Sequence, residues 1–263
     1  MSQLLFRGAK SIHGLMLLCL TTLICFNTVG QGITIFQYRQ VAPDKTEEFV
    51  KRETTYWSKV ARNAKDKGSL SFWALFERVD GADIANEPNY LFINTYPNMD
   101  DSANIWNPAS LFPNVPVANI ETFSMSKVRS QYFLQDKAWE QSSKTNPMKD
   151  FNYMIMVYHN SSDANGFIDM ENRHWRPFIK SSMDNSQTTQ VGWGNSIVLA
   201  PTGNNIRFNS VSYDLFPTLK SALLQEWKTG VKFPETGLDS LMKISKTMPD
   251  RELYRLVKAE SKN

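Results

Sequence analysis

The sequence has little cysteine and little histidine. Its 263 residues include 2 Cys and 3 His, and both cysteines, Cys19 and Cys25, lie near the N-terminus. If this segment is removed on export, the mature chain has no thiol, which excludes cysteine nucleophiles, cysteine-ligated zinc, iron–sulfur clusters and disulfides. Only His159 and His174 would remain, too few for a three-histidine zinc site. We therefore predict no metal and no cofactor.

The chain also lacks a strong excess of charge of either sign. Its formal net charge is +3, and it falls to +1 without Arg7 and Lys10. A near-neutral chain has no electrostatic reason to bind nucleic acid, so we predict no nucleic-acid partner. No Gly-rich nucleotide loop follows a predicted strand. The sequence Gly192-Trp193-Gly194 indicates close packing within a strand rather than phosphate binding.

One long apolar run is present, at the N-terminus. It covers residues 14–26, follows the basic Arg7 and Lys10, and is followed by small residues up to Gly30. This is the pattern of a secretory signal, and we expect cleavage after Gly30. The run is short for a membrane span, which needs about 20 apolar residues, so a retained anchor is the alternative. We predict a secreted or periplasmic protein with no stable membrane span after cleavage.

The rest of the chain contains an internal repeat. Glu53 and Trp57 match Glu171 and Trp175, each 118 residues later (171 − 53 and 175 − 57). Further matches, in the same order and at offsets from 116 to 122 residues, pair Trp73 with Trp193, Phe92 with Phe208, Arg129 with Arg251 and Tyr132 with Tyr254. Because the order is kept and the offsets differ only by loop lengths, we interpret the chain as a tandem duplication.

Each copy has the element order β-α-β-β-α-β of a ferredoxin-like unit. In the first copy, residues 31–146, we expect strands at 33–39, 69–78, 90–96 and 128–136 and helices at 43–65 and 99–106. In the second copy, residues 147–263, we expect strands at 151–159, 188–199, 206–213 and 252–257 and helices at 163–183 and 216–227. The strands are apolar on both faces, so each sheet needs cover on both sides. We predict an α+β fold in which two ferredoxin-like units pack sheet to sheet as one intramolecular α/β barrel.

In its element order, its strand aromatics and the tryptophans Trp57 and Trp175 near the middle of each long helix, the chain resembles the dimeric α/β-barrel superfamily, which includes antibiotic-biosynthesis monooxygenases. The resemblance covers nearly all of residues 31–263. It implies a cleft between helix and sheet that binds a hydrophobic or aromatic small molecule, or haem. Since tandem duplicates pair within one chain, it also implies a monomer with pseudo-dimer symmetry.

A carboxylate interrupts the apolar stripe at the same point of both long helices, as Glu53 and as Glu171. Such a carboxylate, if it faces the sheet, has a raised pKa unless a cation or hydrogen-bond donors offset the lost solvation. Arg129 and Arg251, on the fourth strand of each copy, are the expected partners.

The second copy is the one equipped for proton transfer. His174 follows Glu171 by one helical turn, whereas the first copy has Tyr56 at the matching position. We therefore predict Glu171 and His174 as catalytic acid and base. The predicted ligand-binding residues are Glu53, Tyr56, Trp57, Trp175, Arg129 and Arg251. In the alternative interpretation, the carboxylates form structural ion pairs or hydrogen bonds, and the tryptophans belong to the core.

Two functions stay open from the sequence. One is an exported enzyme that acts on a hydrophobic small molecule and is monooxygenase-like by resemblance. The other is a non-catalytic ligand-binding or structural module in the periplasm or outside the cell. The Pro-rich residues 107–119 are either a lid over the cleft or a plain connector.

Overall fold

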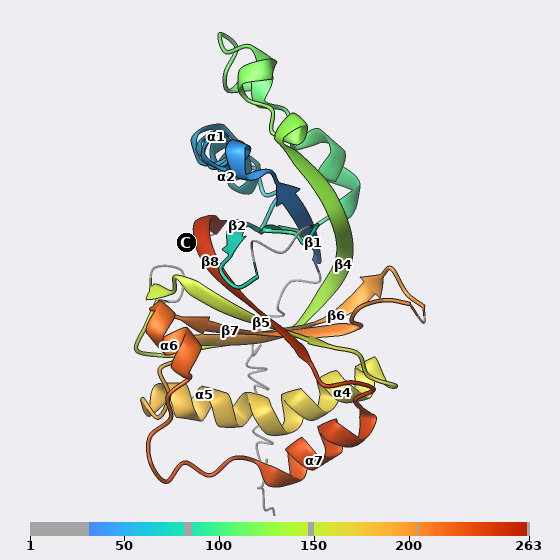
Figure 1. The fold of residues 1–263 in the computed structure, drawn as a ribbon, viewed down its shortest axis with the longest axis vertical. Coiled ribbons are helices and arrows are strands. Elements are labelled where there is room, and N and C mark those ends of the chain that lie inside the picture. The colour runs from blue at the N-terminus through green and yellow to red at the C-terminus, as the bar shows by residue number, and fades with distance from the viewer. Residues whose placement is uncertain (1–31, 82–85, 147–149, 204, 262–263) are drawn as a thin grey trace, which may run out of the picture.

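The computed structural model describes residues 32–81, 86–146, 150–203 and 205–261, so the predicted signal peptide lies outside it. Within the described residues, the strands form a closed barrel in the order β1-β3-β2-β8-β5-β7-β6-β4 (Figure 1). The strands are β1 (Ile33–Val41), β2 (Phe72–Arg78), β3 (Tyr90–Tyr96), β4 (Ser126–Gln141), β5 (Tyr153–His159), β6 (Gly192–Ala200), β7 (Ser210–Phe216) and β8 (Asp250–Ser261).

Helices cover the barrel from outside, one long helix over each half (Figure 1). The first long helix comprises α1 (Thr46–Arg52), a π-helical turn (Glu53–Trp57) and α2 (Ser58–Asp66). The second comprises α4 (Ala164–Met170), a π-helical turn (Glu171–Trp175) and α5 (Arg176–Asp184). The second half also has α6 (Leu219–Leu224) and α7 (Glu235–Ile244), and α7 packs against α4. None of the helices in the described part of the chain is long and apolar enough to cross a membrane.

The strand order confirms the predicted architecture. The first half has the order β4-β1-β3-β2 and the second half β8-β5-β7-β6, which is the same ferredoxin-like order twice. Antiparallel pairing of β2 with β8 and of β4 with β6 joins the halves. Both outer strands of each half therefore find a partner in the other half, and the closed sheet has no free edge.

Several element boundaries differ from the sequence-based expectation. β4 runs to Gln141, beyond the expected end at residue 136, because its second part pairs with β6. The expected helix at 99–106 is a 3-10 helix (Met99–Asn104), and α6 is shorter than the expected 216–227. β7 begins at Ser210 rather than at residue 206, and α7 was not expected.

The strand register corrects three of the sequence matches, those of Phe92 with Phe208, Arg129 with Arg251 and Tyr132 with Tyr254. Leu75 pairs with Phe92 in the first half, and Asn195 pairs with Ser212 in the second. Equivalent strand positions are therefore 120 residues apart (195 − 75 and 212 − 92), and Phe92 corresponds to Ser212. The predicted match of Phe92 with Phe208 is wrong, because Phe208 precedes β7 and is buried inside the barrel.

A hydrogen-bonded network is buried inside the barrel. The equivalent residues Tyr38 and Tyr158 meet there, and the Tyr38 hydroxyl donates to the Tyr158 hydroxyl at 2.9 Å. Tyr158 in turn donates to Glu252 at 2.8 Å. Glu252 is 2% exposed and also accepts from Tyr254 at 2.6 Å and from Arg207 at 2.8 Å. The carboxylate is thus compensated by a charged donor and two hydroxyl groups.

Candidate functional site

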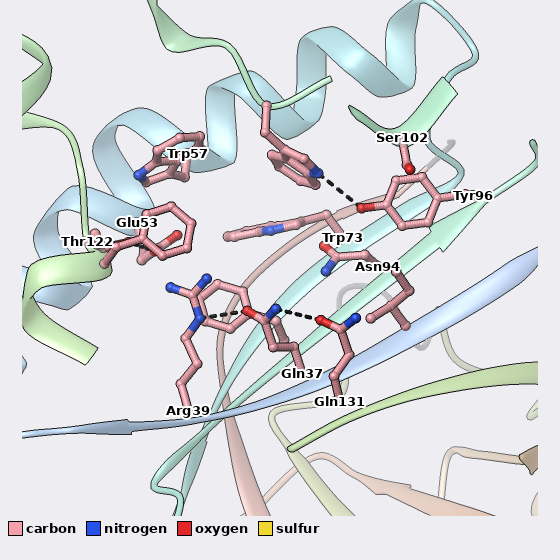
Figure 2. A pocket seen from close by; sticks show the side chains of 14 residues that line it. Gln37, Arg39, Glu53, Trp57, Trp73, Asn94, Tyr96, Ser102, Thr122 and Gln131 are labelled. Carbon is pink, nitrogen blue, oxygen red and sulfur yellow. Dashed lines mark hydrogen bonds between the residues drawn. The ribbon is translucent and has the colours of Figure 1, made fainter. Parts of the chain in front are cut away.

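A cavity of about 410 Å³ lies between the long helix and the sheet of the first half (Figure 2). Its size is that of a site for a small organic molecule. The strands supply Ile35, Gln37, Arg39, Trp73, Phe92, Asn94, Tyr96 and Gln131; the helix supplies Glu53 and Trp57; the segment between β3 and β4 supplies Ser102, Trp106, Thr122 and Phe123.

Alternation along the strands places polar side chains in this cavity. In β1, Ile35, Gln37 and Arg39 face outward toward the helix, whereas Phe36 and Tyr38 belong to the core inside the barrel. Successive residues of a strand point to opposite faces of the sheet. The outer face of β1 therefore becomes more polar toward its end, where it lies under the helix.

Glu53 is the buried ionisable group on the helix side of the cavity. It is 3% exposed, and the Thr122 hydroxyl donates to its Oε1 at 2.7 Å. Burial raises the pKa of Glu53 to about 7, although the bond from Thr122 and the charge of Arg39 both act to lower it. Near neutral pH the carboxyl group is therefore present in both protonation states, as proton transfer requires.

Arg39 is the buried cation of the cavity. Its guanidinium carbon lies 4.9 Å from the centre of the Phe92 ring and 4.8 Å from that of Phe123, between two aromatic faces. Nε donates to Gln37 at 2.6 Å, and the Gln37 amide donates to Gln131 at 2.8 Å (Figure 2). These contacts hold the guanidinium on the sheet side of the cavity, where it remains charged.

The covering segment, residues 97–125, forms the outer wall of the cavity. Trp57 Nε1 donates to the Ile120 carbonyl at 3.0 Å, and Arg52 donates to the carbonyl groups of Ala118 and Glu121 at 2.7 and 2.8 Å. The Pro-rich part of the chain is therefore fastened to the long helix. Residues 107–119 themselves contribute none of the described lining residues, which lie on either side of this stretch, so both interpretations of it stay open.

The same position in the second half holds a different set of groups. Glu171 is 6% exposed and accepts from Ser212 at 2.6 Å and from Asn195 at 2.9 Å. His159 Nε2 lies 4.0 Å from Glu171 Oε1. Burial raises the pKa of Glu171 to about 7 and lowers the pKa of His159 to about 4. Within this packed cluster, the hydrogen bonds of Glu171 go to protein side chains.

The structure does not bring Glu171 and His174 together by a hydrogen bond among the described residues. His174 is half-buried, and Trp175 belongs to an aromatic cluster that packs against the buried Ile179 and Trp193. The cluster consists of Trp175, Phe178, Trp227 and Phe233, with ring centres 4.9 to 6.5 Å apart. The predicted catalytic residues thus lie outside the cavity, which is lined from the first half.

Arg129 does not pair with Glu53. The pairing of β1 with β4 shifts register between Tyr38 and Arg39, and Arg129 is the extra residue in β4. It is exposed and bonds to Gln40 and Asn86. The expected partnership was wrong because the bulge turns this side chain away from the cavity.

Arg251 and Tyr56 also lie apart from the glutamates. Arg251 is exposed, and its charge acts on His159 and Asp214 in the second half. Tyr56 packs edge-on against Phe112 of the covering segment, with ring centres 5.0 Å apart. Of the predicted ligand-binding residues, the cavity contains Glu53 and Trp57.

Sequence reasoning missed Arg39, Gln37 and Gln131. A signal for the first two was present, because Gln37 and Arg39 are alternating polar residues in an otherwise apolar strand. Gln131 pairs with Gln37, and Arg251 pairs with Val157. Because Gln37 and Val157 are equivalent positions, 120 residues apart (157 − 37), Gln131 and not Arg129 is the equivalent of Arg251.

The cavity does not fit the haem that the resemblance implies for some proteins of this fold. Its described lining residues include no histidine, cysteine or methionine, and its one phenol, that of Tyr96, accepts a hydrogen bond from Trp106 at 3.0 Å. No group of three or more His, Cys, Asp or Glu that could hold a metal ion is found in the described part of the chain.

Comparison with known proteins establishes the fold. No family model and no curated protein matches the sequence. Among solved structures, the chain is similar to an anthrone oxidase-like protein, with a TM-score of 0.56 and 10% identity over 88% of this chain and 93% of the other. It is also similar to a candidate monooxygenase from Lactobacillus acidophilus NCFM, with a TM-score of 0.55 and 9% identity over 88% of this chain and 95% of the other.

A candidate monooxygenase from Fusobacterium nucleatum subsp. nucleatum has a TM-score of 0.56 and 9% identity, over 88% of this chain and 94% of the other. Together these similarities show that the chain has the dimeric α/β-barrel fold, with both halves of the barrel in one polypeptide.

Proposed function

We propose that the cavity of the first half binds a planar aromatic molecule with an acidic C–H or O–H group, and that Glu53 accepts its proton. One observation carries this proposal: a buried carboxyl group with a pKa of about 7 lies near a buried guanidinium in a cavity walled by aromatic side chains. A base is most effective when its pKa is close to the working pH.

The other side chains that line the cavity bind the ligand or stabilise the negative charge that forms on it. Trp57, Trp73 and Trp106 offer flat apolar surfaces on which an aromatic ring stacks. Arg39 supplies positive charge for the anion that forms when the proton leaves. The side-chain oxygen of Asn94 is buried with no hydrogen-bond partner in the described structure, so it is free to accept a bond from the ligand.

Oxidation by dioxygen is the reaction that we propose to follow proton removal, in keeping with the anthrone oxidase-like and monooxygenase neighbours. A methylene group between two aromatic rings loses a proton to Glu53, and the carbanion reacts with dioxygen. One oxygen atom becomes the new carbonyl group, and the other leaves as water with the two methylene hydrogens. The chain itself then supplies the base, the cation and an apolar site.

The test uses anthrone, whose activated methylene group lies between two rings. Under anaerobic conditions, tryptophan fluorescence reports binding; in air, oxygen uptake and quinone absorbance report turnover. We expect the wild type to do both. Glu53→Gln should keep binding and lose turnover by about a hundredfold or more, the usual contribution of a general base.

Glu171→Gln is the matched comparison, because it makes the same change in the same π-helical turn of the other half. Turnover that depends on Glu171 and His174 rather than on Glu53 would overturn the proposal and support the sequence-based prediction. Binding of anthrone-like molecules without turnover in any form would instead support the non-catalytic binding module. Location outside the cytoplasm stays a prediction that rests on the N-terminal signal.

A further inference from the structure

A second cavity, of about 530 Å³, lies inside the barrel, toward the end where β1 and β5 begin. Its walls are mostly apolar: Phe36, Phe72, Phe76, Ile93, Pro97, Trp139, Phe151, Met154, Tyr213 and Leu215. The buried network of Tyr38, Tyr158 and Glu252 lies toward the other end of these strands. Because this cavity lies inside the closed sheet and the first one lies outside it, the two cavities are distinct.

Two glycines make room for the aromatic side chains of this cavity. The Tyr213 ring lies so close to Gly194 that a Cβ atom there would collide with it. A Cβ atom on Gly192 would come within 3.3 Å of the Trp139 ring and 3.1 Å of Leu215. The Gly192-Trp193-Gly194 sequence thus has a role in shaping the inner wall, because only glycine leaves this space.

One carboxyl group, that of Asp136, faces this apolar space. Thr34 donates to its Oδ2 at 2.9 Å, and Ser196 donates to its Oδ1 at 2.6 Å. Thr95, which also lines the cavity, bonds to Thr34 at 2.9 Å. The hydroxyl groups around Asp136 donate their hydrogen bonds to one another and to the carboxylate. The oxygen atoms of this wall are therefore left to act as acceptors toward the cavity.

Asp136 has no cationic partner among the described residues. The groups that act on it are the two hydroxyl donors, and burial raises its pKa. Glu252 has Arg207 at 2.8 Å and Glu53 has the nearby charge of Arg39, whereas Asp136, like Glu171, has neutral hydrogen-bond donors. A buried carboxylate without a counter-ion is costly, and a bound cation would relieve that cost.

We propose that the cavity inside the barrel binds a hydrophobic amine, with its ammonium group against Asp136 and its apolar body among the aromatic side chains. The volume suits a molecule with two or three rings or a chain of similar bulk. The ammonium group donates to the free lone pairs of Asp136 and Thr95. The site is independent of Glu53, so it stands or falls separately from the proposed function.

The test compares two probes that share one apolar body, 1-naphthylmethylamine and 1-naphthalenemethanol. The amine is charged and the alcohol is neutral at neutral pH. Isothermal titration calorimetry on the whole protein should show tighter binding of the amine. Asp136→Asn should weaken amine binding by about tenfold or more and leave alcohol binding within about twofold, because only the charge pair is lost.

Asp169→Asn is the matched control, since it makes the same chemical change on the exposed side of α4. It should leave both affinities unchanged. NMR spectra of ¹⁵N-labelled protein locate the site without any variant: the amine should shift the Trp139 indole and Gly194 amide signals and leave the Trp57 and Trp106 indoles in place.

Two outcomes would overturn the proposal. One is equal affinity of the wild type for the amine and the alcohol, which would mean that Asp136 adds nothing to binding. The other is a shift of the Trp57 and Trp106 signals alone, which would place the amine in the cavity outside the sheet. Should Asp136→Asn fail to fold, the NMR result decides the question on the wild type.

Discussion

At the scale of single residues, the two halves differ in what surrounds an otherwise identical carboxyl group. Glu53 and Glu171 occupy the same point of equivalent helices, and burial raises the pKa of each to about 7. The first lies near Arg39 and lines a cavity, whereas the second is bonded to Asn195 and Ser212. Of the two carboxyl groups, Glu53 therefore borders a space that a ligand can enter, and Glu171 is bonded to its protein neighbours.

Both glutamates were predictable from the sequence, because a carboxylate within an apolar helical stripe is conspicuous. Their partners were not. The charge of Arg39 acts on Glu53 from a different element, and the bulge that turns Arg129 away depends on strand register. A single sequence carries no direct record of register.

The first prediction concerns pH and stability. Because the pKa of Glu53 rises from 4.5 to about 7 on folding, the folded protein holds a proton that the unfolded chain releases between these values. This group therefore lowers stability as pH rises through that window. Relative to wild type, Glu53→Gln should gain about 3 kcal/mol in unfolding free energy between about pH 4.5 and pH 7, and no more above it. Urea unfolding across this range measures the difference; a constant difference would contradict the assignment.

The second prediction concerns the cation. The charge of Arg39 lowers the pKa of Glu53, so Arg39→Met should raise that pKa above 7. NMR titration of ¹³C-labelled glutamate carboxyl groups measures the change. Arg129→Met is the control, because Arg129 is exposed and bonds elsewhere. A shift in the control and none in Arg39→Met would restore the partnership expected from the sequence.

At the scale of elements, the shared feature is the π-helical turn in both long helices, at Glu53–Trp57 and Glu171–Trp175. Such turns are single insertions in an α-helix and occur often at functional sites. The sequence predicted the two helices and their apolar stripes. It did not predict the π-helical turns, because the same residues also fit an uninterrupted α-helix.

The third prediction concerns the cover of the first cavity. Trp57→Phe removes the indole N–H that bonds to the Ile120 carbonyl at 3.0 Å. Loss of this hydrogen bond should destabilise the covering segment by about 1 kcal/mol. We expect to observe this as faster amide hydrogen exchange in residues 107–120. Trp175→Phe is the comparison, because it changes the matching residue of the second half, which packs against aromatic and aliphatic side chains. Equal exchange rates in the wild type and Trp57→Phe would show that this bond does not hold the segment.

At the scale of the whole molecule, closure of the barrel joins the halves into one folding unit. Pairing of β2 with β8 and of β4 with β6 crosses between them, and the apolar interior draws on both. The fold was predictable because the strands are apolar on both faces and the element order repeats. The helix α7 was missed, since its residues fall after the repeated pattern.

The fourth prediction follows from this closure. Residues 32–146 alone would expose the edges of β2 and β4 and the inner face of the sheet, so they should be unfolded or self-associated. Co-expressed with residues 147–263, they should form a one-to-one complex, and the intact chain should be a monomer. Size-exclusion chromatography with light scattering and circular dichroism distinguish these cases. A folded monomeric half would show that the halves are separate domains.

The contact between Tyr38 and Tyr158 has a direction. Tyr38 donates a hydrogen bond to Tyr158, and Tyr158 donates one to Glu252. The position equivalent to Glu252 in the first half is Tyr132. In a dimer of two identical chains related by a twofold axis, either both chains or neither would have a glutamate at this position. The hydrogen bonds between the two tyrosines would then have no preferred direction. Because both halves lie in one chain, these hydrogen bonds run in one direction only, and the two halves differ at equivalent positions.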